Sequence, residues 1–302
     1  MSVPAAASPS ASGGSAPRAW LLAARPNTLP ASVAPVLVGA AASGAFRPLP
    51  FVATLAAAVL IQVGVNLAND VQDFHRGADT DARLGPTRVT QAGLLAPRRV
   101  AAGAGVALAT AVLIGVYLVF VAGWPILAIG ITSVVCAWAY SGGPFPLAYR
   151  GLGDLFVFVY FGLFAVGGAA VIQRHGAFVD ALPYAVPMGC LVTAILVVNN
   201  LRDRESDRRS GKYTLAVRLG ERGTIVEYGL LLAVAFAAPP VLWAAGYAPA
   251  GVWLTWLSLP LAVTLLRGVV RVRRGRELNR MLKNTARLDL LFAVLLAVGL
   301  VL

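Results

Sequence analysis

The stretch ALPYAVPMGCLVTAILVVNNLRDRESD, residues 181–207, runs from an apolar span directly into a string of charged and amide side chains. The same transition occurs earlier, where apolar residues 50–69 end in Asn69-Asp70-Val71-Gln72-Asp73. A carboxylate at the centre of a membrane span costs roughly 2.5–3.5 kcal/mol on insertion scales, so carboxylates this close to membrane depth normally mark a functional site. We call residues 69–73 the first motif and residues 199–207 the second motif.

The composition indicates a membrane protein. Of 302 residues, 58% are hydrophobic and only 13% are charged, and the mean hydropathy is +0.76, which excludes a water-soluble globule and a disordered chain. Residues 1–17, rich in Ala, Ser, Pro and Gly, predict a flexible tail before a single domain at 18–302. Nine segments approach the roughly 20 apolar residues that a spanning helix needs: 20–43, 50–69, 101–122, 124–140, 153–173, 181–201, 224–246, 249–267 and 286–302. The expected fold is all-α, with about nine transmembrane helices.

The charge distribution predicts the orientation in the cell membrane. Of the 25 Lys and Arg residues, 23 fall on one side of these spans, and only Arg47 and Arg174 fall on the other. The positive-inside rule then places both motifs at the cytoplasmic face and the C-terminus on the opposite side. The net charge of +12 is expected to set topology and to attract anionic lipid headgroups, above all at the basic run 271–276. Nucleic-acid binding is not expected, since no soluble domain carries the charge.

A weak internal repeat relates the two motifs. Shifting the chain by 130 residues lays Asn69 on Asn199 and Asp73 on Asp203, and it also lays Arg88 on Arg218. Equivalent helices of two halves often face each other across a central site in membrane proteins. The repeat therefore predicts a central cavity, open to the cytoplasmic side, between the spans that carry the motifs.

The spacing within each motif predicts a magnesium site. On a helix, Asn69 and Asp73 share a face, and Asn199, Asp203 and Asp207 recur every fourth residue along another. Mg²⁺ usually takes one or two carboxylates, keeps some water and completes its octahedron with substrate phosphate oxygens. The two sets of oxygen ligands therefore indicate a metal-bound diphosphate.

Cations near the motifs are suited to a diphosphate clamp, in which Arg gives bidentate contacts and Lys a point charge. These cations are Arg76, Arg88, Arg202 and Lys212. A purely structural alternative remains for the acidic residues. Asp70 and Asp73 could cap or solvate a helix end, and Asp203 and Asp207 could pair with the interleaved arginines.

The motifs resemble those of a known family. Asn69 to Asp73 and Asp203 to Asp207 are similar to the two aspartate-rich motifs of the UbiA-type intramembrane prenyltransferase superfamily. Within it, several longer runs resemble the 1,4-dihydroxy-2-naphthoate prenyltransferases of menaquinone biosynthesis. These runs are residues 24–30, 73–80, 83–93, 140–144, 149–154, 199–212 and 214–220. Gly77 stands where many superfamily members have a third aspartate, and Asp79 follows two residues later.

The resemblance implies a reaction and a set of site residues. Mg²⁺ would bind the diphosphate of a polyprenyl diphosphate, and the prenyl group would be transferred to dihydroxynaphthoate with loss of its carboxylate, giving a demethylmenaquinone. The expected metal ligands are Asn69, Asp73, Asn199, Asp203 and Asp207, and the expected catalytic carboxylates are Asp70, Asp73, Asp203 and Asp207.

Four further residues are expected to contact substrate. Tyr140 and Tyr149 could steady a carbocation with their ring faces, and Arg150 could hold a leaving phosphate or the naphthoate carboxylate. Arg25 could reach the acidic aromatic substrate. The alternative for all four is an interfacial aromatic and basic belt. His75 adjoins the first motif, but a single His beside a loop is more often solvated than catalytic.

Two other functions remain open on the sequence. A transporter of a divalent cation or a phosphorylated solute also uses intramembrane carboxylates, although it would need an acidic relay on both sides of the membrane. A prenyltransferase acting on hydroxybenzoate, homogentisate, haem or a sugar phosphate would share the fold and both motifs.

Overall fold

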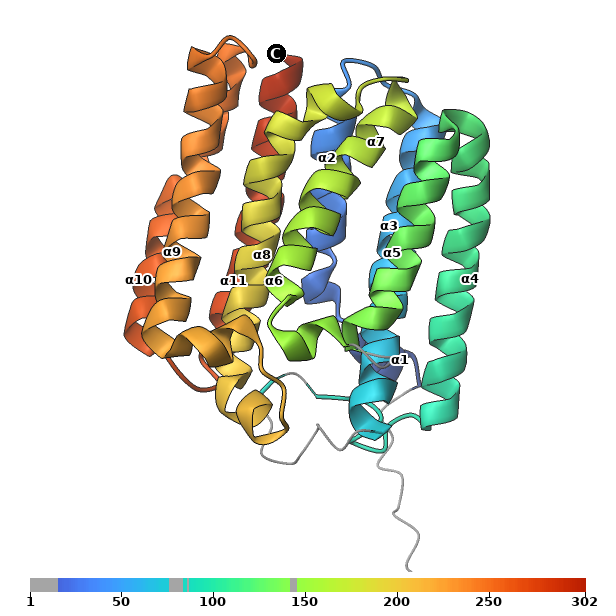
Figure 1. Ribbon diagram of the computed structural model, residues 1–302, viewed down its shortest axis with the longest axis vertical. Helices are drawn as coiled ribbons and strands as arrows, with labels where there is room; N and C mark the ends of the chain where they lie inside the picture. Colours follow the sequence, from blue (N-terminus) through green and yellow to red (C-terminus); the bar gives the residue numbers. More distant parts are fainter. Residues whose placement is uncertain (1–15, 76–83, 86, 142–145) are drawn as a thin grey trace, which may run out of the picture.

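The computed structural model describes residues 16–75, 84, 85, 87–141 and 146–302, and the side chains of 137, 138, 140 and 141 lie outside the described part. Its regular elements are all helical, as the composition predicts (Figure 1). They are α1 (Ala16–Ala24), η1 (Pro26–Thr28), α2 (Pro30–Ala42), α3 (Pro48–His75), α4 (Pro97–Ala122), α5 (Trp124–Ser141), η2 (Leu147–Arg150), α6 (Gly153–Val157), η3 (Phe158–Phe164), α7 (Ala165–Gln173), α8 (Phe178–Arg209), α9 (Leu215–Ala244), η4 (Ala250–Ser258), α10 (Leu259–Val272) and α11 (Leu278–Val301).

Each of the nine expected spans has a helical counterpart. Within the described part of the chain, seven helices are long and apolar enough to cross a membrane. The counterparts of the first and fourth expected spans, α2 and α5, are shorter, although both run alongside the long helices (Figure 1). The structure thus confirms an all-α polytopic fold, and the count of nine crossings stays a prediction at α2 and α5.

The first expected span is broken into three pieces. Arg25 has φ 53°, which ends α1, and prolines at the start of η1 and of α2 lack the N–H that would continue the helix. Asn66 of α3 compensates for the break, because its Nδ2 donates to the Ala24 carbonyl (3.0 Å) and to Thr28 Oγ1 (2.9 Å). A break at membrane depth is tolerated when a neighbouring helix satisfies the freed backbone groups in this way.

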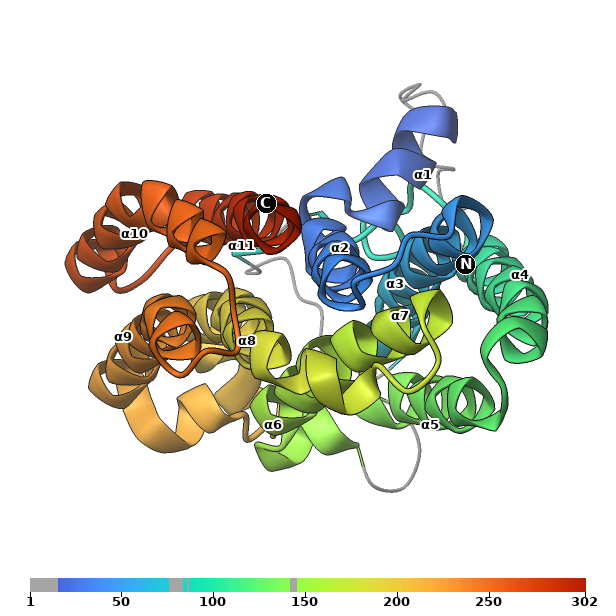
Figure 2. The ribbon, with the colours of Figure 1, turned by 90° about the horizontal axis from the view of Figure 1, so that it is seen from above.

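The centre of the bundle is α8. It has 78% of its apolar window buried, compared with 22% for α3 and for α4. It packs against α2, α7, α9 and α11 (Figure 2). Close approach depends on glycine: a Cβ on Gly39 of α2 would lie 2.2 Å from the Val166 carbonyl oxygen of α7, and one on Gly299 of α11 would lie 2.2 Å from the Gly251 oxygen.

The two motifs lie at the same end of the bundle. Each forms the last turns of a long helix, since α3 continues to His75 and α8 to Arg209, beyond the ends expected from hydropathy. The C-terminus lies at the other end (Figure 1). The helices α3 and α8 stand apart, with α2 and α7 packed against both of them.

The opposite end holds the two isolated arginines. Arg47 donates its backbone N–H to Gln173 Oε1 (2.6 Å), and Arg174 Nε donates to the Ser43 carbonyl (2.6 Å). Arg174 also forms an exposed ion pair with Asp180 at 2.7 Å. These contacts tie the α2–α3 turn to the α7–α8 turn. Arg47 Nη1 also donates to the Ile172 carbonyl (3.4 Å), so both cations have a structural role away from the motifs.

Candidate active site

The first motif anchors the chain segment that follows it. Asp70 is buried, and its carboxylate accepts the backbone N–H of Val89 (3.2 Å) and of Thr90 (3.1 Å), together with the Thr90 hydroxyl. Both carboxylate oxygens are therefore used to hold the 88–90 turn on α3. Because Arg88 directly precedes Val89 in this turn, Asp70 positions the Arg88 side chain.

Arg88 then lies against Asp73, one turn further along α3. Its guanidinium donates to Asp73 Oδ2 in an ion pair whose side chains are only 6% and 13% exposed. A charge-assisted pair in such a poorly solvated place is stronger than one at a surface. The structure therefore holds a cation of the expected clamp directly on the expected metal ligand.

The second motif contains a comparable pair with a different partner. Arg202 is buried and holds Asp203 with two bonds, Nε to Oδ1 (2.8 Å) and Nη2 to Oδ2 (2.5 Å). The same Nη2 donates to Asn199 Oδ1 at 2.8 Å. Asp203 is thus paired with an interleaved arginine, as the purely structural alternative predicts. The same arginine holds Asn199 and Asp203, two of the expected metal ligands, on one face of α8.

A residue that the sequence reasoning missed connects the two motifs. Asn279, in the first turn of α11, accepts from Arg202 Nη1 (2.7 Å) and donates its Nδ2 to the Leu84 carbonyl (2.8 Å). It therefore links the second motif to the segment that follows the first. The expected ninth span begins at 286, so the sequence predicts a loop at this residue. An amide at the start of an apolar helix is a weak signal for such a role.

Lys212 lies beside the segment that carries Tyr149. Its Nζ is 3.7 Å from Asp207 Oδ1 and 5.8 Å from the centre of the Tyr149 ring. The backbone N–H of Tyr213 donates to the Tyr149 carbonyl at 3.1 Å. The η2 segment is therefore docked next to the end of α8, which brings one of the two expected tyrosines close to the second motif.

The internal repeat does not extend to the ion pairs. Arg218, the expected counterpart of Arg88, donates to the Arg150 carbonyl (2.9 Å) and to the Tyr213 carbonyl (3.4 Å) rather than to Asp203. The repeat is thus visible in the positions of the motifs at the ends of α3 and α8, and it is lost in their contacts.

The remaining candidates are placed less tightly. Arg25 sits half-buried at the break between α1 and η1, and Arg150 is exposed at the end of η2. Arg76, Gly77 and Asp79, like the side chain of Tyr140, lie outside the described residues.

The donor set fits a metal that is bound together with substrate. Among the residues that the structure describes, no three His, Cys, Asp or Glu side chains form a group that could hold a metal ion by themselves. Each motif instead offers one or two carboxylates with an amide oxygen, namely Asp73 with Asn69, and Asp203 and Asp207 with Asn199. This is the mode of Mg²⁺, which leaves its other positions to water and phosphate oxygens.

The comparison with known families agrees with this geometry. The sequence profile of the UbiA prenyltransferase family matches residues 31–301. This chain belongs to the UbiA prenyltransferase family. The family resemblance and the enzyme class expected from the motifs are thereby confirmed, and the protein is a prenyltransferase with a multi-pass membrane fold.

Among curated relatives, the 1,4-dihydroxy-2-naphthoate octaprenyltransferase of Mycobacterium tuberculosis is 39% identical over 92% of this chain and 95% of its own length. Among solved structures, the UbiA homolog from Aeropyrum pernix superposes with a TM-score of 0.72 at 17% identity, covering 89% of this chain and 97% of that one. The Archaeoglobus fulgidus homolog bound to DMAPP and Mg²⁺ superposes with a TM-score of 0.61 at 14% identity, covering 93% and 98%. The structural matches confirm the fold.

Proposed function

We propose that this protein transfers a polyprenyl group from a polyprenyl diphosphate to 1,4-dihydroxy-2-naphthoate with decarboxylation, giving a demethylmenaquinol, the hydroquinone form of a demethylmenaquinone. The proposal rests on the geometry of the two motifs taken together with the sequence alignment. Both aspartate motifs lie at one end of the bundle with a buried arginine on each, in a chain aligned over nearly its whole length with a curated naphthoate prenyltransferase. We assign this end to the cytoplasmic face because the order of the spans in the sequence puts 23 of the 25 basic residues on the side of the motifs.

The metal would be Mg²⁺, held by Asn69 and Asp73 of α3 and by Asn199, Asp203 and Asp207 of α8. When bound, it neutralises the diphosphate and lets this group depart with the electron pair of the allylic C–O bond.

The buried arginines supply the second part of the clamp. Arg88 and Arg202 already lie against Asp73 and Asp203, so a diphosphate brought to these carboxylates meets two guanidinium groups. Their fixed positions stabilise the negative charge that develops on the leaving group without further reorganisation. In this scheme Asp70 acts by positioning Arg88 rather than by touching substrate, because both of its oxygens are bonded to the 89–90 backbone and the Thr90 hydroxyl.

The allylic carbon of the prenyl diphosphate would lie near Tyr149. The ring of Tyr149 lies beside the Lys212 ammonium group, and an aromatic face there can stabilise the allylic cation as it forms. Tyr140 is assigned the same task, and Arg25 and Arg150 are assigned to the carboxylate of the aromatic acid. The ring carbon attacks the cation to form a C–C bond, and the carboxylate leaves as CO₂ while its bonding electrons return to the ring. The product keeps both ring hydroxyls and is therefore the hydroquinone, a demethylmenaquinol, so atoms and charge balance without an external oxidant.

A product assay tests the proposal. Purified protein in nanodiscs, supplied with Mg²⁺, dihydroxynaphthoate and prenyl diphosphates of several lengths, should release diphosphate and CO₂ only when both organic substrates are present. Turnover of hydroxybenzoate or homogentisate in place of dihydroxynaphthoate would keep the fold and overturn the acceptor. Uptake of Mg²⁺ or phosphate into proteoliposomes without any prenylated product would overturn the enzyme in favour of a transporter.

A further inference from the structure

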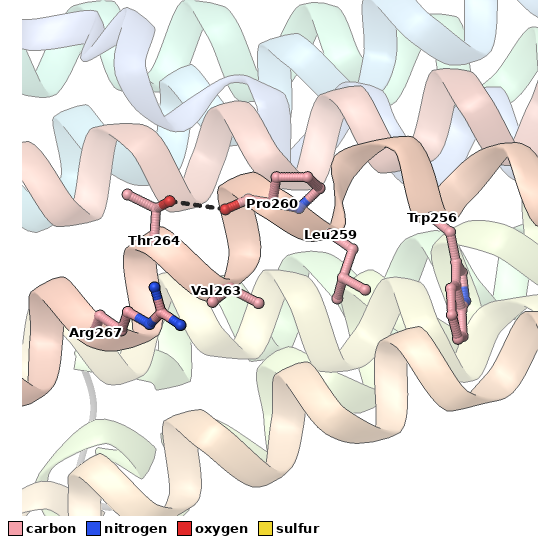
Figure 3. Close-up of a pocket in the computed structure, with 6 residues that line it drawn as sticks. All are labelled: Trp256, Leu259, Pro260, Val263, Thr264 and Arg267. Carbon is pink, nitrogen blue, oxygen red and sulfur yellow. Dashed lines mark hydrogen bonds between the residues drawn. The ribbon is translucent and has the colours of Figure 1, made fainter.

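A groove lies on α10, away from both motifs. It has a volume of about 450 Å³ and is lined by Trp256, Leu259, Pro260, Val263, Thr264 and Arg267 (Figure 3). Leu259, Val263 and Arg267 recur at every fourth position, so they follow one another along one side of the helix. The volume is within the range of sites that bind small molecules.

The groove is apolar except at one end. Trp256 is 42% exposed and Val263 is 37% exposed, at the edge of the bundle where α10 lies (Figures 1 and 2). The Thr264 hydroxyl donates to the Pro260 carbonyl at 2.8 Å, so its proton is used within the helix. Arg267 is therefore the charged donor that the groove offers to a ligand.

The charge at this end is strongly positive. No ion pair found among the described residues involves Arg267. The chain from 267 to 287 carries eight basic residues and a single carboxylate, Glu277. Arg274 is paired with Glu221 at 2.5 Å, which raises the pKa of its guanidinium, and no ion pair within the described part of the chain involves the other basic residues of 267–287. An anionic ligand is therefore favoured beside Arg267.

The shape and the charge together define one class of occupant. From Trp256 to Arg267 a helix rises roughly 16 Å, a length that accommodates much of an acyl chain. A monoanionic phosphate placed at Arg267 would lie at the start of the basic stretch 267–287, in which Arg271 and Arg280 are also exposed. A prenyl diphosphate is less suited, because the lining contains no carboxylate or amide to hold its metal ion.

We propose that the α10 groove is a binding site for an anionic phospholipid, with an acyl chain along Trp256, Leu259 and Val263 and the headgroup phosphate on Arg267. The site is independent of the prenyl-transfer reaction. It would fix the edge of the bundle to anionic lipid at the membrane face where the basic residues gather.

Trp256 provides a direct test. Full-length protein is placed in phosphatidylcholine nanodiscs that contain brominated phosphatidylglycerol as a minor component, or the same fraction of brominated phosphatidylcholine. The Trp256 signal is the difference in fluorescence between wild type and Trp256→Phe. We expect the anionic lipid to quench this signal at a concentration about fivefold lower, the factor that one cation contributes near an anionic surface. Arg267→Gln should remove the preference.

Arg287→Gln is the matched control, because it removes an exposed basic residue that does not line the groove. It should keep the preference. Equal quenching by both lipids in the wild type, or an equal loss of preference in Arg267→Gln and Arg287→Gln, would overturn a specific site. Displacement of the brominated lipid by a prenyl diphosphate would assign the groove to substrate instead. Native mass spectrometry gives a second readout: wild type should retain phosphatidylglycerol that Arg267→Gln loses.

Discussion

At the scale of single residues, the candidate site consists of carboxylates that are already paired with arginine. Asp73 is paired with Arg88 and Asp203 with Arg202, and all four side chains are at most 13% exposed. Removing one partner of such a pair leaves an uncompensated charge and costs about 3–5 kcal/mol in buried settings. A loss of activity must therefore be separated from a loss of folding whenever these residues are changed.

The first prediction concerns these carboxylates. Asp73→Asn and Asp203→Asn keep the shape of the side chain and one oxygen ligand, but they remove the charge that the metal requires. We expect each to lower the rate of prenyl transfer by about a hundredfold or more. The measurement is initial rate against Mg²⁺ concentration, with the thermal midpoint of each variant followed in parallel.

Asp180→Asn is the control for this pair, since Asp180 forms an exposed ion pair with Arg174 at the far end of the molecule. It should leave the rate unchanged. Near-normal turnover of folded Asp73→Asn and Asp203→Asn at limiting Mg²⁺ would contradict the assignment of the metal ligands.

The second prediction concerns Lys212. Its ammonium group lies between Asp207 and the ring of Tyr149, where it can meet a phosphate oxygen. Lys212→Ala should raise KM for the prenyl diphosphate about tenfold and leave KM for the aromatic acid nearly unchanged, because a charge-assisted bond to one substrate is lost. Lys283→Ala, an exposed lysine on α11, should change neither constant. Equal effects on both substrates would remove Lys212 from the diphosphate clamp.

At the scale of secondary-structure elements, helix contacts depend on a few glycines. Gly39 allows α2 to approach α7, since a Cβ there would lie 2.2 Å from the Val166 oxygen and 2.8 Å from Ala169 Cβ. The short helix α2 also packs against α3, α8 and α11, so its position supports both motif-bearing helices.

The third prediction follows from this contact. Gly39→Ala should destabilise the folded protein by about 1–3 kcal/mol, because α2 and α7 must move apart to admit one methyl group. Gly115→Ala is the matched control on α4, where a Cβ would meet open space. It should be neutral or stabilising by up to about 1 kcal/mol. Thermal unfolding in one detergent compares the two variants, and equal midpoints would show that the α2–α7 contact yields easily.

At the scale of the whole molecule, the two ends of the bundle differ in charge and in role. The motif-bearing ends of α3 and α8 lie at the same end of the bundle, and the α9–η4 turn and the C-terminus lie at the other end (Figure 1). Since 23 of the 25 basic residues belong to the side of the motifs, this end should face the cytoplasm.

The fourth prediction tests this orientation. A membrane-impermeant thiol reagent applied to intact cells should label Ala250→Cys, at the exposed start of η4, and should leave Ser206→Cys unmodified. The native Cys136 and Cys190 lie within apolar helices, where a charged reagent does not reach. Labelling of Ser206→Cys without permeabilisation would reverse the topology and turn the proposed site away from the cytoplasm.

Much of this architecture was predictable because it depends on local patterns. Apolar runs of sufficient length locate α3, α4, α8, α9 and α11, since each backbone polar group in a bilayer must be satisfied within its own helix. The spacing of the two motifs likewise predicts a shared helix face, and the structure places each motif on one continuous helix. The break at Arg25 was less predictable: the prolines indicated a kink, but the compensating contacts come from Asn66, 42 residues away from Ala24.

The sequence by itself determined the helical membrane fold, the family and the two aspartate motifs, because hydropathy, helical spacing and side-chain chemistry act over a few neighbouring residues. Only the tertiary structure decided which groups the motifs contact. Asn279 bonds to Arg202 across 77 residues and to Leu84 across 195, and Arg88 reaches Asp73 while its repeat counterpart Arg218 binds backbone carbonyls. The physical reason is that a hydrogen bond requires atoms about 3 Å apart, and the packing of distant helices sets that distance.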